Sequence, residues 1–352
     1  MKAAAGPKDA RRADHQSKPF AARRWFRQTD TMILIGACLV IGTFFSLTTN
    51  GFLTAVGLST MAVQLPEIGL MTLGMMMTMV IRGIDLSIND TANLSAAVAG
   101  FLVLFLAKLL PNAHGGGATA LMLASLILVA LAVGFVGGLL NGLLVGYLGI
   151  TPVLATLGTL TLYRGITVGI TKGEALTNFP EQLSVIGNGT LAGIPISFVI
   201  FLGVSVVVFL LLKRTVFGFE TRMLGTNPTA ARFSGIRTVA ITWKVYALSG
   251  VLGALAGVII MSRTSSVSYE YGTQTYVLLA ILIGVVSGAE PGFGSALNVV
   301  LAVFVFQMLS TGFDMLLVGL PGSSFFKQFA WGMVFVLFFI INTVVRRRRG
   351  RS

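Results

Sequence analysis

Gly74-Met-Met-Met-Thr-Met-Val-Ile-Arg-Gly-Ile-Asp-Leu-Ser-Ile-Asn89 is the stretch in which a long apolar run gives way to polar side chains within one turn. Four polar residues follow the glycine that ends the apolar run: Asp85, Ser87, Asn89 and Asp90. Aspartate or asparagine here can accept hydrogen bonds from the free N–H groups of the next helix, which predicts a capped turn between two helices. Polar, irregular backbone at membrane depth is tolerated only against protein or a water-filled path, so the same residues also fit a functional site.

The rest of the chain has the composition of a membrane protein. Of its 352 residues, 55% are hydrophobic and 11% are charged, whereas a soluble domain has about 25% charged residues. The net charge is +13, and 18 of the 25 basic residues lie in three segments, 1–30, 213–237 and 346–351. A nucleic-acid-binding face would interleave these charges with exposed aromatic residues, so we expect no nucleic acid partner. Basic residues collect in cytoplasmic loops, and the three segments therefore predict the cytoplasmic side.

Ten apolar runs can be placed, since a helix needs about 20 residues to span about 30 Å of hydrocarbon. Six runs separate the first basic segment from the second, and four separate the second from the tail, so both termini are predicted to be cytoplasmic. The predicted fold is all-α, a polytopic membrane protein of about ten transmembrane helices. The runs are 31–48, 61–81, 92–110, 118–148, 151–171, 194–213, 239–262, 276–295, 296–320 and 328–345.

Some of these helices are expected to be broken or re-entrant. The fourth run is too long for a simple span, and the eighth contains Glu290 and Pro291. The first thirty residues lack apolar periodicity, which predicts disorder. The expected domains are a disordered basic cytoplasmic arm at 1–30, a transmembrane domain at 31–345 with a cytoplasmic loop at 213–237, and a basic cytoplasmic tail at 346–352.

The residue types that carry most enzyme and metal chemistry are scarce. The chain has one cysteine, Cys38, and two histidines, His15 and His114, both of which lie outside the apolar runs. No disulfide, zinc site, haem site or catalytic triad can be built from these residues. A Gly-Lys dipeptide is missing too, so we expect no phosphate-binding loop, no enzyme activity and no cofactor in this chain. Five methionines between positions 71 and 79 admit a thioether metal site but are typical of adaptable apolar packing.

The segment Arg82-Gly-Ile-Asp-Leu-Ser-Ile-Asn89 resembles the Gly-Gly-Ile-Asp-Leu-Ser-Val-Gly segment of the permease subunits of bacterial sugar-importing ABC transporters, the group of the ribose, arabinose, xylose, rhamnose and autoinducer-2 systems. Arg82 replaces a glycine and predicts a local pair with Asp85, and Asn89 replaces the last glycine. The resemblance extends over about 60–340. It continues at Leu140-Asn-Gly142, at Ile150–Gly165, at Phe217-Gly218 followed by Gly225–Ile236, and at Ser287–Ser295.

This resemblance implies a membrane-spanning permease subunit of an ABC importer in the bacterial inner membrane. It would translocate a sugar or sugar-like small polar solute into the cytoplasm by ATP-driven alternating access. The implied partners are a cytoplasmic ATPase subunit that carries ATP and Mg, a periplasmic substrate-binding protein, a second permease chain, identical or paralogous, and the lipid bilayer. The residues expected to line the path, because their polar groups suit a sugar's hydroxyls, are Asp85, Ser87, Asn89, Asn141, Thr156 and Thr159.

The segment 225–236 also carries a helix signature of its own. Asn227 is a good N-cap, Pro228 suits the first helical position and Gly235 suits the exit, which predicts a two-turn helix at 228–234. A helix this short needs a surface to pack against. An ordinary surface loop is the alternative, whereas the resemblance implies a contact with the ATPase. The residues expected to make that contact are Thr226, Asn227, Pro228, Ala230, Ala231, Arg232, Phe233 and Gly235.

Among the charged residues inside the predicted spans, Glu67, Arg164 and Asp314 lie at a similar depth. Counted from the outer ends of their spans, they share a depth of about 9 to 10 Å. We therefore predict that Arg164 pairs with Glu67 or Asp314 near the outer mouth of the path, either for function or as a purely structural ion pair. An arginine that extends to the interface is the other interpretation.

An ion-coupled secondary transporter of a small polar solute is the alternative function. Such a protein needs an acidic relay at the middle of the membrane. The acids that the sequence places lie near the span ends, which counts against this alternative.

Overall fold

The structure, a computed structural model of the chain, describes residues 20–109, 116–273 and 275–318 and isolated positions between 326 and 340. Within these residues the fold is almost entirely helical, and the only strands form one short hairpin. The elements are α2 (Phe20–Thr48), α3 (Ala55–Val80), α4 (Ile88–Leu109), α5 (Gly116–Gly146), α6 (Pro152–Thr171), η1 (Glu181–Leu183), α7 (Ser184–Asn188), β1 (Thr190–Leu191), β2 (Ile194–Pro195), α8 (Ile196–Arg214), α9 (Val216–Thr226), α10 (Pro228–Phe233), α11 (Thr238–Thr264), α12 (Tyr276–Val286) and α13 (Ala296–Leu316).

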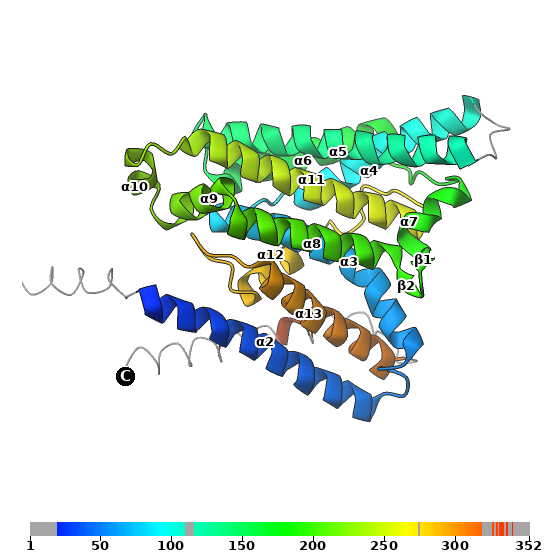
Figure 1. The fold of residues 1–352 in the computed structure, drawn as a ribbon. Coiled ribbons are helices and arrows are strands. Elements are labelled where there is room, and N and C mark those ends of the chain that lie inside the picture. The colour runs from blue at the N-terminus through cyan, green and yellow to red at the C-terminus, as the bar shows by residue number, and fades with distance from the viewer. Residues whose placement is uncertain are drawn as a thin grey trace, which may run out of the picture.

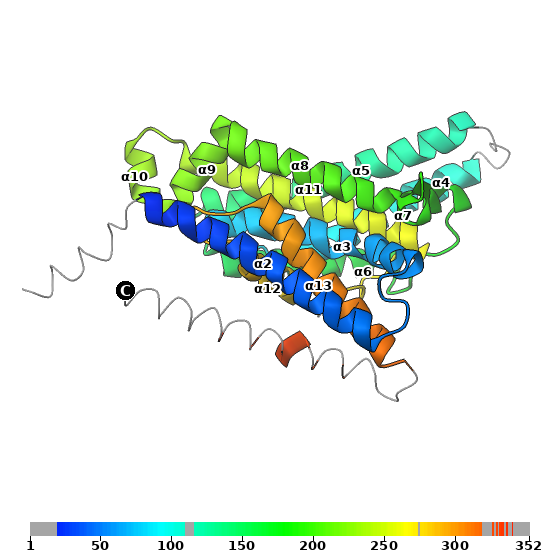
Figure 2. The same ribbon diagram turned by 60° about the horizontal axis from the view of Figure 1, so that its bottom comes forward.

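The long helices lie side by side in a bundle, and the predicted all-α membrane fold is confirmed (Figure 1). Eight of the described helices are long and apolar enough to cross a membrane. The short helices α9 and α10 lie at one end of the bundle, the α10 end, and α7 with the β1–β2 hairpin lies at the other, the hairpin end. The start of α2 lies at the α10 end, as the six crossings between them require (Figures 1 and 2). Which side of the membrane this end faces stays a prediction.

The eighth predicted span, 276–295, is broken, as expected from Glu290 and Pro291, and its helix ends at Val286. The helix α12 has 11 residues and is about 16 Å long, half of the apolar layer of about 30 Å. After α12 the chain turns through Gly288 and Gly292, both at positive φ, and forms a bridge between Glu290 and Phe293. The positive φ of Gly288 ends α12, and Pro291, which has no N–H to donate, keeps the helix from resuming there. The tenth predicted span, 328–345, lies outside the continuously described residues.

Two other boundaries differ from the prediction. The fourth span is not broken, because α5 is a single helix of 31 residues. The helix α2 begins at Phe20, so the arm predicted to be disordered over 1–30 is helical from that residue on. Residues 1–19 and the basic tail 346–352 lie outside the described residues.

Glycines bring α5 and α11 into backbone contact at the centre of the bundle. A Cβ added to Gly134 would lie 2.4 Å from the carbonyl oxygen of Gly250, and one on Gly138 would lie 2.2 Å from that of Tyr246. Small residues in such positions let membrane helices approach closely. This contact places Asn141 of α5 and Ser249 of α11 against the turn at 81–87.

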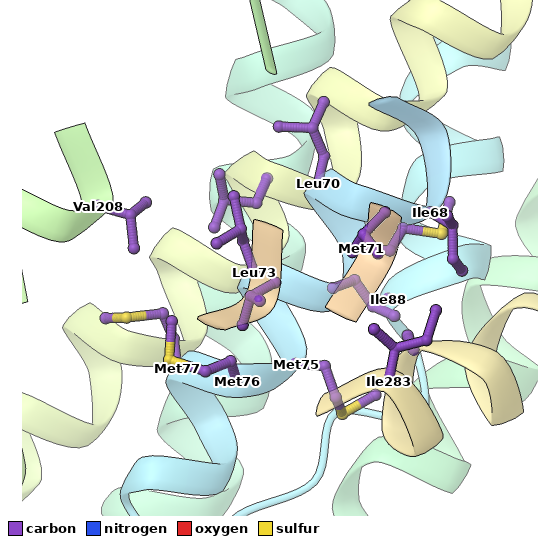
Figure 3. Close-up of a cluster of buried hydrophobic side chains, with 14 of the residues drawn as sticks. Ile68, Leu70, Met71, Leu73, Met75, Met76, Met77, Ile88, Val208 and Ile283 are labelled. Atoms are coloured by element: carbon purple, nitrogen blue, oxygen red, sulfur yellow. The ribbon is translucent and has the colours of Figure 1, made fainter. Parts of the chain in front are cut away.

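The methionines of α3 pack in the apolar core. Met71, Met75, Met76 and Met77 are fully buried, and they share one cluster with Ile88 and other aliphatic side chains (Figure 3). Their apolar packing is confirmed. Around this core α13 packs on α3, and α2 packs on α13 along one side of the bundle (Figure 2).

Candidate functional site

The turn between α3 and α4 carries the carboxylate of Asp85 into the interior of the bundle. This side chain is 1% exposed. It accepts hydrogen bonds from the Ser87 backbone N–H at 3.1 Å, from the Ser87 hydroxyl at 2.7 Å and from the Ser249 hydroxyl at 2.7 Å. Buried polar groups in native proteins are satisfied by hydrogen bonds in this way, so the fold accommodates the buried carboxylate of Asp85.

The helices α5 and α6 complete the network around Asp85. Asn141 Nδ2 donates to the Ser87 hydroxyl at 2.7 Å, and Thr159 donates to Asn141 Oδ1 at 2.6 Å. Thr156 donates to the carbonyl of Ile84, in the same turn, at 3.2 Å. The structure therefore brings together five of the six residues predicted to line the path.

These five residues are closed off from solvent in this structure. Each is at most 2% exposed, and they bond one another within one chain. A solute could reach them only if α5, α6 or the 81–87 turn moved apart. Their role in a transport path stays a prediction.

The sixth predicted path residue, Asn89, lies apart from this network. Its Nδ2 donates to the carbonyl of Tyr271 at 3.0 Å, and Asn93, one turn later, donates to the same carbonyl at 3.0 Å and to that of Tyr269 at 3.2 Å. Two amides of α4 thus hold the irregular segment 265–275 that leads into α12. Asn93 was not predicted, although its spacing of four residues from Asn89 places both on one helix face.

The predicted pairing of Arg164 with Glu67 or Asp314 is wrong. Arg164 pairs with Asp90, with its Nε 2.8 Å from Oδ1 and its Nη2 3.2 Å from Oδ2. This two-point geometry is the strong form of an arginine–carboxylate pair. The prediction counted depth from span ends, but the turn at 81–87 re-enters the bundle and starts α4 in the interior. Asp90 is therefore buried, at 1% exposure.

Glu67 pairs instead with Arg263 in the last turn of α11. The hydroxyls of Tyr276 and Tyr271 donate to Glu67 Oε2 at 3.0 and 3.2 Å, and Arg263 Nη2 donates to the Tyr271 hydroxyl at 2.7 Å. We call these four residues the Glu67 cluster. The third residue of the predicted charge cluster, Asp314, belongs to neither ion pair and is exposed in the last turn of α13.

The predicted pair of Arg82 with Asp85 is wrong, because Arg82 instead fastens the 81–87 turn to the end of α9, directly before α10. Its Nε donates to the carbonyl of Gly225 at 2.7 Å and its Nη2 to that of Thr226 at 2.9 Å. The backbone of Arg82 has φ 68°, a region that costs an L residue about 1–2 kcal/mol and is free of cost for glycine. The sugar-permease segment has a glycine where this chain has Arg82, and a left-handed backbone favours glycine there.

The predicted short helix is confirmed as α10. Asn227 Oδ1 accepts from the Ala230 N–H at 3.0 Å, and Gly235 leaves the helix at φ 80°. Phe233 is 88% exposed, whereas Ala231 is fully buried and therefore does not belong to the predicted contact face. Next to α10 lies a hollow of about 770 Å³, lined from α5, α9, α10 and α11 and bordered by Pro228 and Phe233.

No metal site is evident in the described part of the chain, where no three His, Cys, Asp or Glu side chains are grouped as ligands. The acids of the interior are instead engaged with arginine, serine and tyrosine.

The chain is similar to known transport proteins. Residues 57–344 match the family described as "Branched-chain amino acid transport system / permease component". The ribose import permease protein of Bacillus subtilis (strain 168) is 30% identical over 302 residues, which cover 84% of this chain and 88% of that protein. An autoinducer 2 import system permease protein of Klebsiella pneumoniae is 31% identical over 262 residues, 72% of this chain and 74% of that protein. Another, from Yersinia enterocolitica, is 32% identical over 268 residues, 75% and 69%. No solved structure matches this chain.

Proposed function

This chain belongs to the family of branched-chain amino acid transport system permease components, and from that premise we propose that it moves a sugar or sugar-like solute into the cytoplasm by ATP-driven alternating access. The resemblance to the sugar-type permeases of bacterial ABC importers is confirmed by its relatives. The chain is therefore a multi-pass permease component and not an enzyme. The inner membrane of a bacterium is its proposed location.

The substrate proposal rests on the relatives and on the interior. One relative is a ribose import permease. The interior of the bundle holds hydroxyl, amide and carboxylate groups on four elements, namely the 81–87 turn, α5, α6 and α11. Such groups can exchange hydrogen bonds with the hydroxyls of a sugar when the helices separate.

The exposed Phe233 on α10 is the observation that best supports an ATPase partner. A helix of six residues is marginal alone, yet α10 is capped and presents an aromatic side chain that is 88% exposed beside a hollow. Aromatic side chains are frequent anchors of protein interfaces. Arg82 links the last two carbonyls of α9, directly before α10, to the turn that carries Asp85, so motion at α10 can reach the closed network.

The other partners proposed are a periplasmic substrate-binding protein and a second permease chain, identical or paralogous. The helix α6 presents large apolar side chains outward, including Leu154, Leu157 and Ile166. This face suits lipid or the second chain. ATP and Mg would be held by the ATPase subunit.

The ion-coupled alternative is strengthened by one observation. The sequence placed the acids of this chain near the span ends. Asp85 and Asp90, however, are each 1% exposed and lie in the interior. A buried carboxylate can serve a proton or sodium relay.

Uptake into proteoliposomes distinguishes the two functions. We would reconstitute the chain alone, and with its cognate ATPase and binding protein, and measure uptake of labelled D-ribose, L-arabinose, D-xylose and L-rhamnose. The importer proposal predicts uptake that requires ATP on the ATPase side and both partner proteins. Uptake by the chain alone on a proton or sodium gradient would overturn it.

The contact with the ATPase has its own test in Phe233→Ala. Loss of an aromatic anchor costs about 2–4 kcal/mol of binding, so we expect ATPase binding to fall by about thirtyfold or more with unchanged thermal unfolding. Phe219→Ala on α9, where the side chain is 61% exposed, is the matched control. Equal ATPase binding, by pull-down or by biolayer interferometry, for Phe233→Ala and wild type would contradict the docking role of α10.

A further inference from the structure

We propose that the open cavity between Arg164 of α6 and the wall formed by residues 269–273 with Thr275 is a binding site for a neutral, polyhydroxylated solute on its way through the permease. The cavity has a volume of about 530 Å³ and is lined by Arg164, Tyr269, Glu270, Gly272, Thr273 and Thr275. The proposal rests on the proposed function, because it names where the sugar is held before it reaches the closed Asp85 network.

The side chains of the lining have the chemistry that recognises a sugar. A guanidinium group and the Thr275 hydroxyl can donate, and a carboxylate can accept. The Thr273 hydroxyl donates to the Glu270 carbonyl at 3.1 Å and can accept from a solute, and a tyrosine ring offers an apolar face. The volume falls in the range of about 300–1,000 Å³ typical of small-molecule sites. The solute therefore has room together with its first hydration waters.

The positive charge of the cavity is compensated, because Arg164 pairs with Asp90, so nothing in the lining calls for an anionic solute. Asp90 occupies Nε and Nη2 of Arg164, and Nη1 has no hydrogen-bond partner among the described residues. The hydroxyl of Tyr269 donates to Glu270 at 2.9 Å. That hydrogen bond raises the pKa of the Tyr269 hydroxyl. Within the described residues the carboxylate of Glu270 forms no ion pair, so an anionic solute is disfavoured.

The wall of the cavity is held in place from inside the bundle. Asn89 and Asn93 bind the backbone carbonyls of Tyr269 and Tyr271. Gly272 adopts φ 68°, and a Cβ on it would lie 2.7 Å from Asn89 Oδ1, a buried atom with no partner among the described residues. The segment is therefore positioned before the solute arrives, which lowers the entropic cost of binding.

The cavity also lies beside the closed network. Asn89 and Asp90 are consecutive on α4, so the residue that holds the cavity wall adjoins the one that pairs with Arg164. Asp90, the partner of Arg164, is thus about one helical turn from Ser87. The hollow beside α10 is larger but borders Phe233, and the one near Arg222, at about 20 Å³, has room for about one water.

The transport test removes one hydroxyl at a time. Thr273→Val and Thr275→Val keep the side-chain shape, and each should lower the maximal uptake rate of the sugar that the wild-type complex transports by about fivefold to tenfold, as one lost hydrogen bond would. The apparent KM should stay within about twofold, because affinity rests with the binding protein. Thr273→Ser should restore the rate, and Thr60→Val, at an exposed threonine of α3, should have no effect.

A binding test works on the permease without its partners. In a Cys38→Ala background, Thr273→Cys is the single thiol of the chain. We expect D-ribose to slow its reaction with a water-soluble maleimide, relative to betaine at equal osmolality, and to leave Thr60→Cys unaffected. The binding site is overturned, and the proposed function is not, if the wild-type complex transports sugar, the threonine variants transport it at the full rate, and D-ribose does not protect Thr273→Cys from the maleimide. No ATP-dependent uptake by the wild-type complex would overturn the proposed function instead.

Discussion

The two arginine–carboxylate pairs of the interior differ in what else they touch. In the Glu67 cluster the carboxylate is 2% exposed, and it binds Arg263 and two tyrosine hydroxyls. The cluster thereby joins α3, α11, the segment 265–275 and α12. In the other pair Asp90 is buried but the side chain of Arg164 is 36% exposed and lines an open cavity. We infer that the Glu67 cluster maintains the fold and that the Arg164–Asp90 pair serves the solute.

The largest effect on stability is expected from Glu67→Ala. Removing one partner of a buried pair leaves an uncompensated charge, at a cost of about 3–5 kcal/mol. The variant also leaves the hydroxyls of Tyr271 and Tyr276 without their acceptor. Thermal unfolding of the purified chain in detergent measures the loss. A midpoint equal to that of the wild type would break the comparison, because the cluster would then not hold the fold.

A smaller loss of stability is expected from Arg164→Gln. The arginine is partly exposed, so water can solvate Asp90 in its place, and we expect a loss of about 1–3 kcal/mol. Uptake should fall far more than this stability loss explains. Arg164→Lys keeps the charge but loses the two-point geometry, and should recover part of the uptake. If uptake follows stability in both variants, the pair is only structural.

The smallest effect on stability is expected from Arg82→Gly. Arg82 binds backbone carbonyls and not an acid, so this variant shows what the loss of an arginine without an ion pair does. The variant removes a left-handed arginine, worth about 1–2 kcal/mol, but also two hydrogen bonds of about 1 kcal/mol each. Thermal unfolding should therefore shift little. The number of ATP molecules hydrolysed per sugar should rise, because α10 is no longer fastened to the 81–87 turn. An unchanged ratio would contradict this linkage.

Local chemistry was enough to predict several features. The residues Asn227, Pro228 and Gly235 predicted α10, because capping depends on neighbours in the sequence alone. The apolar runs predicted the long helices, because the hydrophobicity of about 20 consecutive residues also depends on the sequence alone. Five of the six residues predicted to line the path, all but Asn89, meet in one network. The resemblance pointed to these residues, and their role in a path stays a prediction.

The errors arise where the backbone departs from simple crossings. Depth was counted from span ends, but the 81–87 turn re-enters the bundle, so Asp90 lies deep enough to meet Arg164. The last turn of α11 is held against α3, so Arg263 meets Glu67 although it lies at a helix end. Neither contact can be found from sequence spacing, because both depend on how irregular segments pack.

A double substitution tests the central claim, that the Arg164–Asp90 pair serves the solute and not the fold. Arg164→Gln with Asp90→Asn removes both charges and keeps polar groups that can bond, so no uncompensated charge is left. We predict that thermal stability returns close to that of the wild type, whereas ATP-dependent sugar uptake by the reconstituted complex stays as low as in Arg164→Gln. In the matched control, Glu67→Gln with Arg263→Gln, uptake should follow the recovery of stability. Uptake that recovers together with stability in the Arg164–Asp90 double variant would contradict the claim.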